Sequence, residues 1–324
     1  MTYLKLFVSH FGDSYFMQQW KVKAFIQNII SLFPDRVSSK IYFYIQKKFG
    51  NLRSPKCDVG INAGLDVWKK ILEQGETPID KIFFELGTGR TPMLPLTLWL
   101  MGAKKIITVD LNFYYKKKMF RDCVNFLLDD LNRTHRIFDG YLLESRLNIL
   151  CKNRGSNIDL NSIGIEYISP QDAGLLNIST GFVDYYVSHN VLEHIHKKVI
   201  KSILSEGVRV LSKDGMFIHR IDYSDHFSHS DKSISAINFL QYSDFLWSLY
   251  ASNRFMYMNR IRHDDFLNIL SKFCQNILSI DVEIDSKITD LLGNNQLLLD
   301  KQFRNKSIEI LSITSALVVS DVRK

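Results

Sequence analysis

A pair of glycines, Gly87 and Gly89, follows a short apolar run in the segment FFELGTGRTP. Glycine permits a tight turn and a close approach of the backbone to a ligand, so the pattern is typical of a nucleotide-binding turn between a strand and a helix. The dinucleotide-binding turn has a third glycine where Pro92 stands here. Because proline is accepted in the first turn of a helix, we expect a helix to begin near Pro92 and the ligand to differ from a dinucleotide.

Three carboxylates follow or precede the ends of predicted strands near this turn. Glu85 precedes the glycines, Asp110 ends the run KIITVD 21 residues after Gly89, and Asp172 follows the run IEYIS. Glu85 would repel a pyrophosphate but would attract an ammonium or sulfonium group. Asp110 can accept hydrogen bonds from ribose hydroxyls, and Asp172 can accept one from an adenine amino group. S-adenosylmethionine carries all of these groups, and we predict it as the cofactor.

Histidines are concentrated in two windows that follow or overlap predicted strands. Six of the nine lie there: His189, His194, His196, His219, His226 and His229. Methyl transfer to a hydroxyl needs a base that removes the proton, and histidine titrates near neutrality. We predict His226 as the catalytic base with Asp225 as its neighbour, and Asp222 is an alternative orienting acid. The competing interpretation is a polar loop with solvated histidines.

A metal ion is a further alternative for the same two windows. Glu193 with His194, or Asp225 with His226 and His229, would supply oxygen and nitrogen ligands. No spacing among these residues dictates a ligand geometry, so we predict no metal site.

The elements that must position these residues begin after residue 80. Short apolar runs alternate with helical stretches, which predicts a parallel sheet covered by helices on both faces. The predicted strands are KIFFE, KIITVD, IEYIS, FVDYYVS and GMFIHRI, followed by the closing pair ILSIDVEI and ITSALVVSDV. Helices are expected near Pro92, Tyr114, Gln171 and His194, and residues 285–307 are expected to be irregular.

Residues 1–80 show helical rather than strand patterns. Apolar spacing predicts helices over residues 17–33, 38–50 and 64–75. We therefore divide the chain into an N-terminal helical segment, 1–80, and an α/β domain, 81–324. Residues 222–265 form an aromatic-rich insertion on the substrate side of that domain.

Five motifs in order resemble the class I S-adenosylmethionine-dependent methyltransferases: ELGTG, VDLN, QDAGLL, FVDYYVSHNVLEHI and RVLSKDGMFI. The resemblance covers residues 80–220 and implies a Rossmann-like, seven-stranded, mostly parallel sheet whose last strand is antiparallel. It also implies the cofactor-binding residues. The methionine side would contact Glu85, Gly87, Thr88 and Gly89, the ribose Asp110 and Leu111, the adenine Asp172 and Ala173, and the pocket floor Ser188, His189 and Asn190.

Two stretches depart from the simplest family pattern. Residues 137–164 intervene before the third strand, and residues 221–266 resemble bacterial methyltransferases associated with surface polysaccharides. The latter resemblance implies a sugar or sugar-nucleotide hydroxyl as acceptor. Aromatic residues of this stretch would cover the substrate or pack in a core. Its polar residues would bind a carboxylate, phosphate or sugar: Arg254, Asn259, Arg260 and Arg262.

Composition limits the other functional classes. The chain of 324 residues has a net charge of +7 and no apolar run long enough to span a membrane. Its four cysteines form no CxxC pair, and its start lacks a secretion signal pattern, so we expect a cytoplasmic protein. An RNA methyltransferase and a non-catalytic S-adenosylmethionine-binding module are the alternatives, and a nicotinamide oxidoreductase is disfavoured. We expect a small-molecule or glycan acceptor and no nucleic-acid partner, and self-association stays open.

Overall fold

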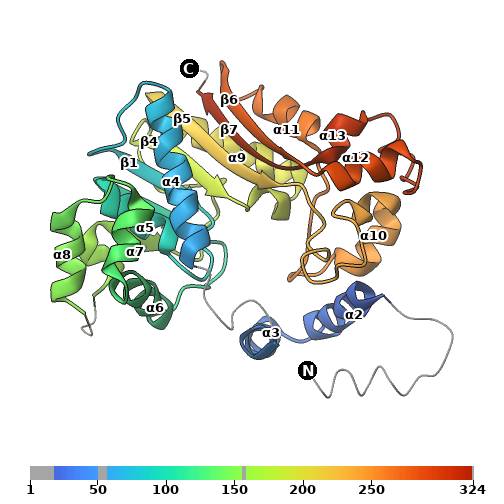
Figure 1. Ribbon diagram of the computed structural model, residues 1–324, viewed down its shortest axis with the longest axis horizontal. Coiled ribbons are helices and arrows are strands. Elements are labelled where there is room, and N and C mark those ends of the chain that lie inside the picture. The colour runs from blue at the N-terminus through green and yellow to red at the C-terminus, as the bar shows by residue number, and fades with distance from the viewer. Residues whose placement is uncertain (1–17, 50–56, 155–157, 323–324) are drawn as a thin grey trace.

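A computed structural model describes residues 18–49, 57–154 and 158–322 of the chain (Figure 1). The predictions for the first 17 residues and for Gly50 lie outside these ranges. Within them, no helix is both long and apolar enough to cross a membrane.

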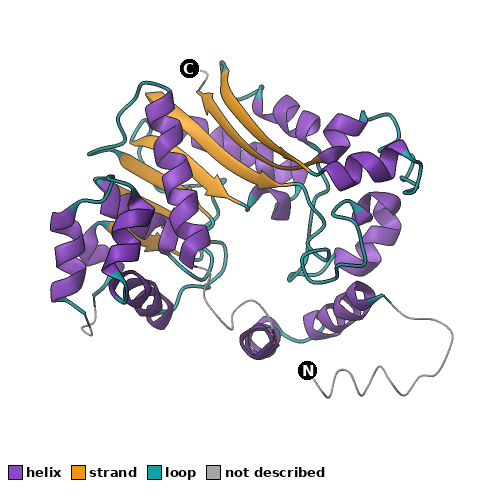
Figure 2. Cartoon of the chain, in the orientation of Figure 1, coloured by secondary structure: helices purple, strands orange, loops and turns teal. Residues whose placement is uncertain are grey.

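One seven-stranded sheet forms the centre of the molecule (Figure 2). Its strands are β1 (Ile82–Leu86), β2 (Lys105–Val109), β3 (Ile165–Ile168), β4 (Val183–His189), β5 (Leu211–Asp222), β6 (Ile277–Ile284) and β7 (Ile313–Asp321). The spatial order is β3-β2-β1-β4-β5-β7-β6. Neighbours from β3 to β5 pair in parallel, whereas β7 runs antiparallel to both β5 and β6. All seven predicted strands and the class I methyltransferase fold are therefore confirmed.

Helices cover both faces of the sheet because successive strand residues point to opposite sides. Phe83 packs into the core on one face and Phe84 into the core on the other. The first face is covered by α4 (Cys57–Glu73), α5 (Met93–Met101), α6 (Lys117–Leu128), α7 (Leu131–Phe138) and α8 (Glu144–Lys152). The second face is covered by α9 (Lys197–Val210) and α11 (His263–Leu270). The predicted two-sided α/β architecture is confirmed.

The helix α4 belongs to the layer that covers the sheet. Its side chains Ile61, Leu65 and Trp68 are buried in the same core as α5, and the Trp68 ring stacks on Phe83 at a centroid distance of 6.3 Å. A boundary at residue 80 would therefore separate α4 from the layer that it completes.

Two predictions of local structure are wrong. No helix begins at Gln171, because the Asp172 side chain forms a turn by accepting a hydrogen bond from the Gly174 backbone at 2.8 Å. Residues 285–307 are not irregular throughout, since α12 (Ser286–Gly293) begins there after the capping residue Asp285. A short helix, α13 (Ile308–Ser312), then leads directly into β7.

The stretch 137–164 does not disturb the sheet. It holds the end of α7, the helix α8 and the 3-10 turn η2 (Leu160–Ile163), and its apolar residues Leu147 and Leu150 join the core of the first face. The third strand consequently pairs with β2 as the sequence predicts.

A third, separate core joins the N-terminal helix α2 (Gln19–Ser31) to the insertion after β5 and to α12 and α13. The next helix, α3 (Asp35–Phe49), contacts the insertion through the ring of Tyr42, which stacks on Phe255. The insertion contains the 3-10 turn η4 (Asn238–Gln241) and α10 (Asp244–Ala251). Trp20 on α2 is fully buried, and its ring lies 4.9 Å from Tyr250 and 5.4 Å from Phe227 between centroids. Figure 1 shows α2 beside α10, at a distance from the sheet.

We predict that Trp20→Ala releases α2 from this third core. Truncating a fully buried aromatic residue costs about 3–5 kcal/mol. The contacts of α2 with the insertion that remain are largely hydrogen bonds, such as those of Lys23 and Asn28. Urea unfolding and limited proteolysis within α2 measure the effect. Phe25 on the same helix is 60% exposed, so Phe25→Ala is the matched control and should change stability by less than about 0.5 kcal/mol. Equal effects of the two substitutions would contradict the packing role of Trp20.

Candidate functional site

The parallel register aligns the carboxyl ends of the central strands. Leu86 of β1 lies between Val109 of β2 and Ser188 of β4, and Ser188 lies beside His219 of β5. Ligands of open α/β sheets bind beyond this edge. The turns that follow these strands carry most of the residues that the sequence selects.

The glycine turn after β1 has the backbone that its residues predict. Gly87 and Gly89 have φ angles of +84° and +65°, which favour glycine. The Gly87 backbone nitrogen donates to the Val109 carbonyl at 2.8 Å, and Gly89 donates to Asp110 Oδ2 at 3.0 Å. A side chain at Gly87 would lie 2.5 Å from Val191, whereas Gly89 faces open space. The turn is thus closed on the Val191 side and open at Gly89.

Glu85 lies beneath this turn as a buried acid. Its side chain is 3% exposed and accepts a short hydrogen bond from the Thr108 hydroxyl, which in turn lies 2.5 Å from the Thr88 hydroxyl. Burial raises the pKa of Glu85 to about 8; the Thr108 hydrogen bond opposes this shift and the charge of Asp110 adds to it. At neutral pH the group is therefore largely protonated, and a nearby cation would favour its ionisation.

The other predicted cofactor residues near β2 and β3 differ in exposure. Asp110 is largely buried and also accepts from the Asn112 backbone at 3.0 Å, while Leu111 beside it is 66% exposed. The loop after β3 is tied to the same place, because Gln171 donates to the Asp110 carbonyl at 2.9 Å. Asp172 is exposed at this edge, and Ala173 packs in the hydrophobic core.

The end of β4 places its three predicted residues in different environments. Ser188 is buried, and its hydroxyl is 2.8 Å from Nδ1 of His219 inside the sheet. His189 and Asn190 line a pocket of about 600 Å³, and Asn190 has a positive φ of 54°. Burial, followed by the charge of Arg220, lowers the pKa of His189, so its ring is mainly neutral.

This pocket is polar and lies between α4 and the carboxyl ends of β4 and β5. Its lining includes Asp66, His189, Arg220, Asp222, His229 and Glu283. Arg220 is held by Glu283 at 2.8 Å and lies 3.4 Å from Asp66. Such a lining suits a hydroxylated or charged molecule rather than an apolar one.

The acid beside His226 is Asp222, and the predicted pairing with Asp225 is wrong. Asp225 is fully buried and accepts hydrogen bonds from the Phe227 backbone at 2.9 Å and from the Asn238 side chain at 3.0 Å, so it stabilises its own loop. Asp222 Oδ2 lies 3.2 Å from His226 Nε2 and 3.7 Å from His229 Nε2. Asp222, the last residue of β5, thus supplies the carboxylate that lies beside both imidazoles.

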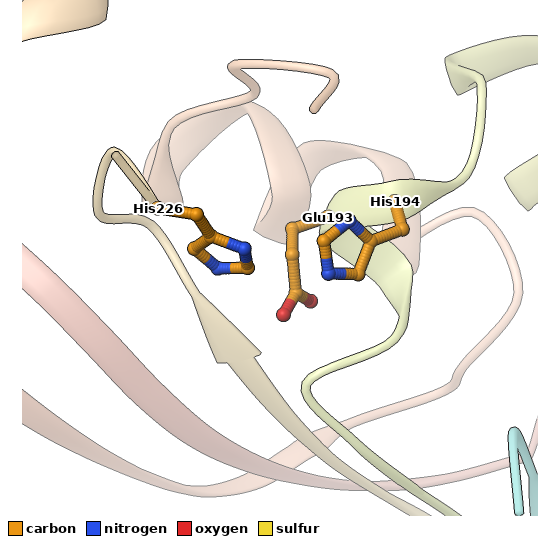
Figure 3. Close-up of side chains that lie close together, drawn as sticks. All are labelled: Glu193, His194 and His226. Atoms are coloured by element: carbon orange, nitrogen blue, oxygen red, sulfur yellow. The ribbon is translucent and has the colours of Figure 1, made fainter. Parts of the chain in front are cut away.

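The 3-10 turn η3 (Leu192–His194) brings two further residues to this place. Figure 3 shows the Glu193 carboxylate reaching between the rings of His194 and His226. Those rings lie 4.8 Å apart between centroids. A carboxylate and two imidazoles therefore converge between the ends of β4 and β5.

The polar residues expected to bind an acceptor from the insertion serve the fold instead. Arg262 is fully buried and donates to the backbone carbonyls of Tyr223 and Ile313, both at 2.6 Å. Arg260 is bound to the Phe239 carbonyl and to Asp244, and Arg254 is bound to Asp35. The interpretation of these arginines as acceptor ligands is therefore not supported.

Helix α3 lies next to the glycine turn. The guanidinium of Arg90 is 5.2 Å from the centre of the Phe43 ring and 4.9 Å from that of Tyr114, and the Lys116 ammonium is 3.7 Å from the Phe43 ring. These cation–π contacts join α3 to the turns after β1 and β2. The N-terminal helices thus border the candidate cofactor site.

Some site residues could not be selected from the sequence. Asp66 and Glu283 reach the pocket from α4 and β6, and no local motif marks them. Arg220 carried a weak signal, because strand alternation places it on the same face as the buried Met216 and Ile218.

Comparison with known proteins finds solved structures with a similar fold. No family model matches the chain, and no curated protein matches it. Solved structures do. The PH0226 protein of Pyrococcus horikoshii OT3 has 14% identity over 87% of this chain and 98% of its own, with a TM-score of 0.48. An S-adenosylmethionine-dependent methyltransferase of Mesorhizobium loti has 13% identity over 78% and 96%, with a TM-score of 0.42.

A third solved structure is the geranyl diphosphate C-methyltransferase of Streptomyces coelicolor A3(2). It has 11% identity over 80% of this chain and 79% of its own, with a TM-score of 0.43. At such identities the likeness concerns the fold alone. The strand order and the antiparallel β7 establish that fold without it.

We predict that the buried Glu85 makes stability fall as pH rises. The pKa of Glu85 in the folded chain, about 8, lies above the ordinary value of 4.5, so folding favours the protonated form. This stabilisation is complete below pH 4.5 and is lost as pH rises towards 8. Between pH 5 and 8 the wild type should lose on the order of 3 kcal/mol relative to Glu85→Gln, measured by urea unfolding. The exposed Glu76 is the control position, as Glu76→Gln, and parallel pH curves for wild type and Glu85→Gln would refute the assignment.

Proposed function

We propose that the protein is an S-adenosylmethionine-dependent methyltransferase that acts on a hydroxyl or amine of a small-molecule or glycan-type acceptor. The observation that carries this proposal is the turn after β1. In it a left-handed Gly89 donates to Asp110 above the buried acid Glu85, at the carboxyl edge of a sheet with this strand order.

The turn suits a cationic adenosyl donor in three respects. Gly89 leaves open space for the ligand, and Asp110 offers a carboxylate at the end of β2 for a ribose. Glu85 can ionise when a positive ligand approaches, since its pKa already lies near the working pH. A pyrophosphate, in contrast, would be repelled by the negative charges of Glu85 and Asp110.

The polar pocket supports the acceptor class. Asp222 and His229 line the pocket and also belong to the cluster around His226. A hydroxylated acceptor in the pocket would therefore lie beside groups able to assist deprotonation. Asp66, Arg220 and Glu283 would bind further hydroxyls or charges of a sugar or sugar nucleotide. We place the reaction in the cytoplasm as part of the same proposal.

Binding of the cofactor is the first test. Calorimetry should detect one molecule of S-adenosylmethionine or S-adenosylhomocysteine per chain. Gly89→Ala should weaken this binding at least 10-fold, because the added methyl group enters the open space and the backbone is strained at φ +65°.

A matched glycine separates these two effects. Gly140 has a φ of +85° and also faces open space, but it lies in the turn between α7 and α8. Gly140→Ala should cost similar stability, about 1–2 kcal/mol, and leave cofactor affinity unchanged. If neither ligand binds the wild type, or if both variants bind the cofactor equally well, the proposed cofactor site is wrong.

Turnover distinguishes an enzyme from a binding module. Labelled S-adenosylmethionine is incubated with a panel of monosaccharides and nucleoside-diphosphate sugars, and transfer of the label is measured. We expect transfer by the wild type and none by His226→Ala, which should keep its cofactor affinity. Cofactor binding without transfer to any acceptor, including a cell extract, would favour the non-catalytic module.

A further inference from the structure

The cluster between β4 and β5 contains more metal-ligating groups than acid–base catalysis requires. Glu193, His194 and His226 each place a ligand atom within 4.8 Å of the others, and so do Asp222, His226 and His229. The two groups share His226. The two groups thus lie side by side, and Glu193 and His194 belong to one while Asp222 and His229 belong to the other.

Glu193 lacks the partner that a buried carboxylate needs. Its side chain is 3% exposed, and neither carboxylate oxygen has a hydrogen-bond partner among the described residues. Burial raises its pKa well above the usual range. A buried carboxylate is retained at low cost when it is paired or when it coordinates a metal ion.

The tautomer of His194 is fixed by its backbone partner. Its Nδ1 lies 2.9 Å from the Tyr257 carbonyl oxygen, which can only accept, so Nδ1 carries the proton. The lone pair is therefore on Nε2. Metal-binding histidines commonly have this arrangement, with one ring nitrogen donating to a carbonyl and the other coordinating.

His226 contributes a nitrogen without a hydrogen-bond partner. His226 Nε2 is buried and makes no hydrogen bond among the described residues, although Asp222 Oδ2 lies 3.2 Å away. Asp222 belongs to the second group, with His226 and His229, and not to the group of Glu193 and His194. Its carboxylate can therefore orient the His226 ring from outside the ligand set.

We propose that Glu193, His194 and His226 bind one divalent first-row transition-metal ion such as Zn²⁺, Co²⁺ or Mn²⁺. Two imidazoles with one carboxylate favour these ions over Mg²⁺ and Ca²⁺, which prefer oxygen ligands. The proposal revises the sequence-based prediction that no metal is bound. It also makes His226 a metal ligand rather than a free base.

The role of the ion rests on the proposed methyltransferase function. Asp222 lines the polar pocket and lies 3.2 Å from His226, so an acceptor hydroxyl that passes Asp222 would reach the ion, which would lower the pKa of the hydroxyl. Its proton passes to water, and the oxygen forms a bond to the methyl carbon while the carbon–sulfur bond of the sulfonium breaks. The electron pair of that bond stays on sulfur, so S-adenosylhomocysteine is neutral at sulfur.

Titration with the metal alone tests the site. The full-length protein is treated with a chelator, dialysed, and titrated with Co²⁺ by visible absorption and with Zn²⁺ by calorimetry, in the absence of cofactor. We expect one ion per chain. Glu193→Gln and His226→Ala should each weaken binding at least 10-fold. His135→Ala is the control, because His135 is an exposed histidine paired with Glu144 on the far helix pair α7 and α8.

Stability measurements exclude trivial unfolding. Glu193→Gln removes a buried acid without a partner, so the metal-free variant should unfold at a temperature no lower than the wild type. Zn²⁺ should raise the unfolding temperature of the wild type and of His135→Ala but not of Glu193→Gln.

The proposal is overturned if Co²⁺ and Zn²⁺ do not bind the wild type, or if they bind Glu193→Gln and His226→Ala as tightly as His135→Ala. Cofactor titration of the same samples keeps the two proposals separate. Metal binding without cofactor binding would sink the methyltransferase assignment alone, and cofactor binding without metal binding would sink the metal site alone.

Discussion

Three hydrogen bonds from Asn259 hold the turn after β4, and both halves of the candidate site depend on this turn. The Asn259 backbone donates to the Glu193 carbonyl at 2.9 Å, and its side-chain amide donates to the carbonyls of Leu192 and Ile195 at 2.7 and 2.8 Å. At the start of the turn, Val191 lies against Gly87 of the cofactor loop. In its middle, Glu193 and His194 reach the cluster around His226. A displacement of this one turn would therefore disturb cofactor and acceptor sides together.

The insertion after β5 explains why the N-terminal helices are needed. Asn259 lies within this insertion, whose apolar residues form the third core together with residues of α2, α12 and α13. Trp20 on α2 completes that core, and Tyr42 on α3 stacks on Phe255 at 4.2 Å between ring centroids. The helix α3 also contacts Arg90 beside the glycine turn. The first helices of the chain thus join the acceptor-side insertion to the cofactor-side loop.

Sequence patterns predicted the frame of the molecule well and its long-range contacts poorly. Strands β1 to β7 were recognisable because each is a short, continuous or alternating apolar run, and the turn at Gly87 and Gly89 follows from local backbone preference. The partner of His226 was not recognisable, since Asp222 and Asp225 are both near in sequence. Only the path of the loop decides which faces inward. Asp225 accepts a hydrogen bond from the Asn238 side chain, and no periodicity in the sequence indicates this contact across 13 residues.

The arginines of the insertion show that long-range contacts also decide whether a charged residue is structural or functional. Arg260 and Arg262 carry charges that a sequence-based interpretation assigns to ligand binding, yet their donors saturate backbone carbonyls that loops leave unpaired. The insertion, residues 222–265, has little regular structure and therefore many such carbonyls, and guanidinium groups with five donors can satisfy several at once. The structural role of these arginines could be recognised only once their carbonyl partners were known.

The two buried acids, Glu85 and Glu193, show how electrostatics divides the site. Both are 3% exposed and both have raised pKa values, but Glu85 is stabilised by the Thr108 hydroxyl, whereas Glu193 has no hydrogen-bond partner among the described residues. Because Glu85 already accepts a hydrogen bond, a cation that is present only for part of the reaction is enough to favour its ionisation. An organic sulfonium, which loses its charge on methyl transfer, is such a cation. After transfer that attraction disappears, and the neutral product leaves a site that again favours protonated Glu85. A buried acid without a hydrogen-bond partner and with imidazoles beside it, in contrast, suits a cation that keeps its charge throughout the reaction, as a bound metal ion does.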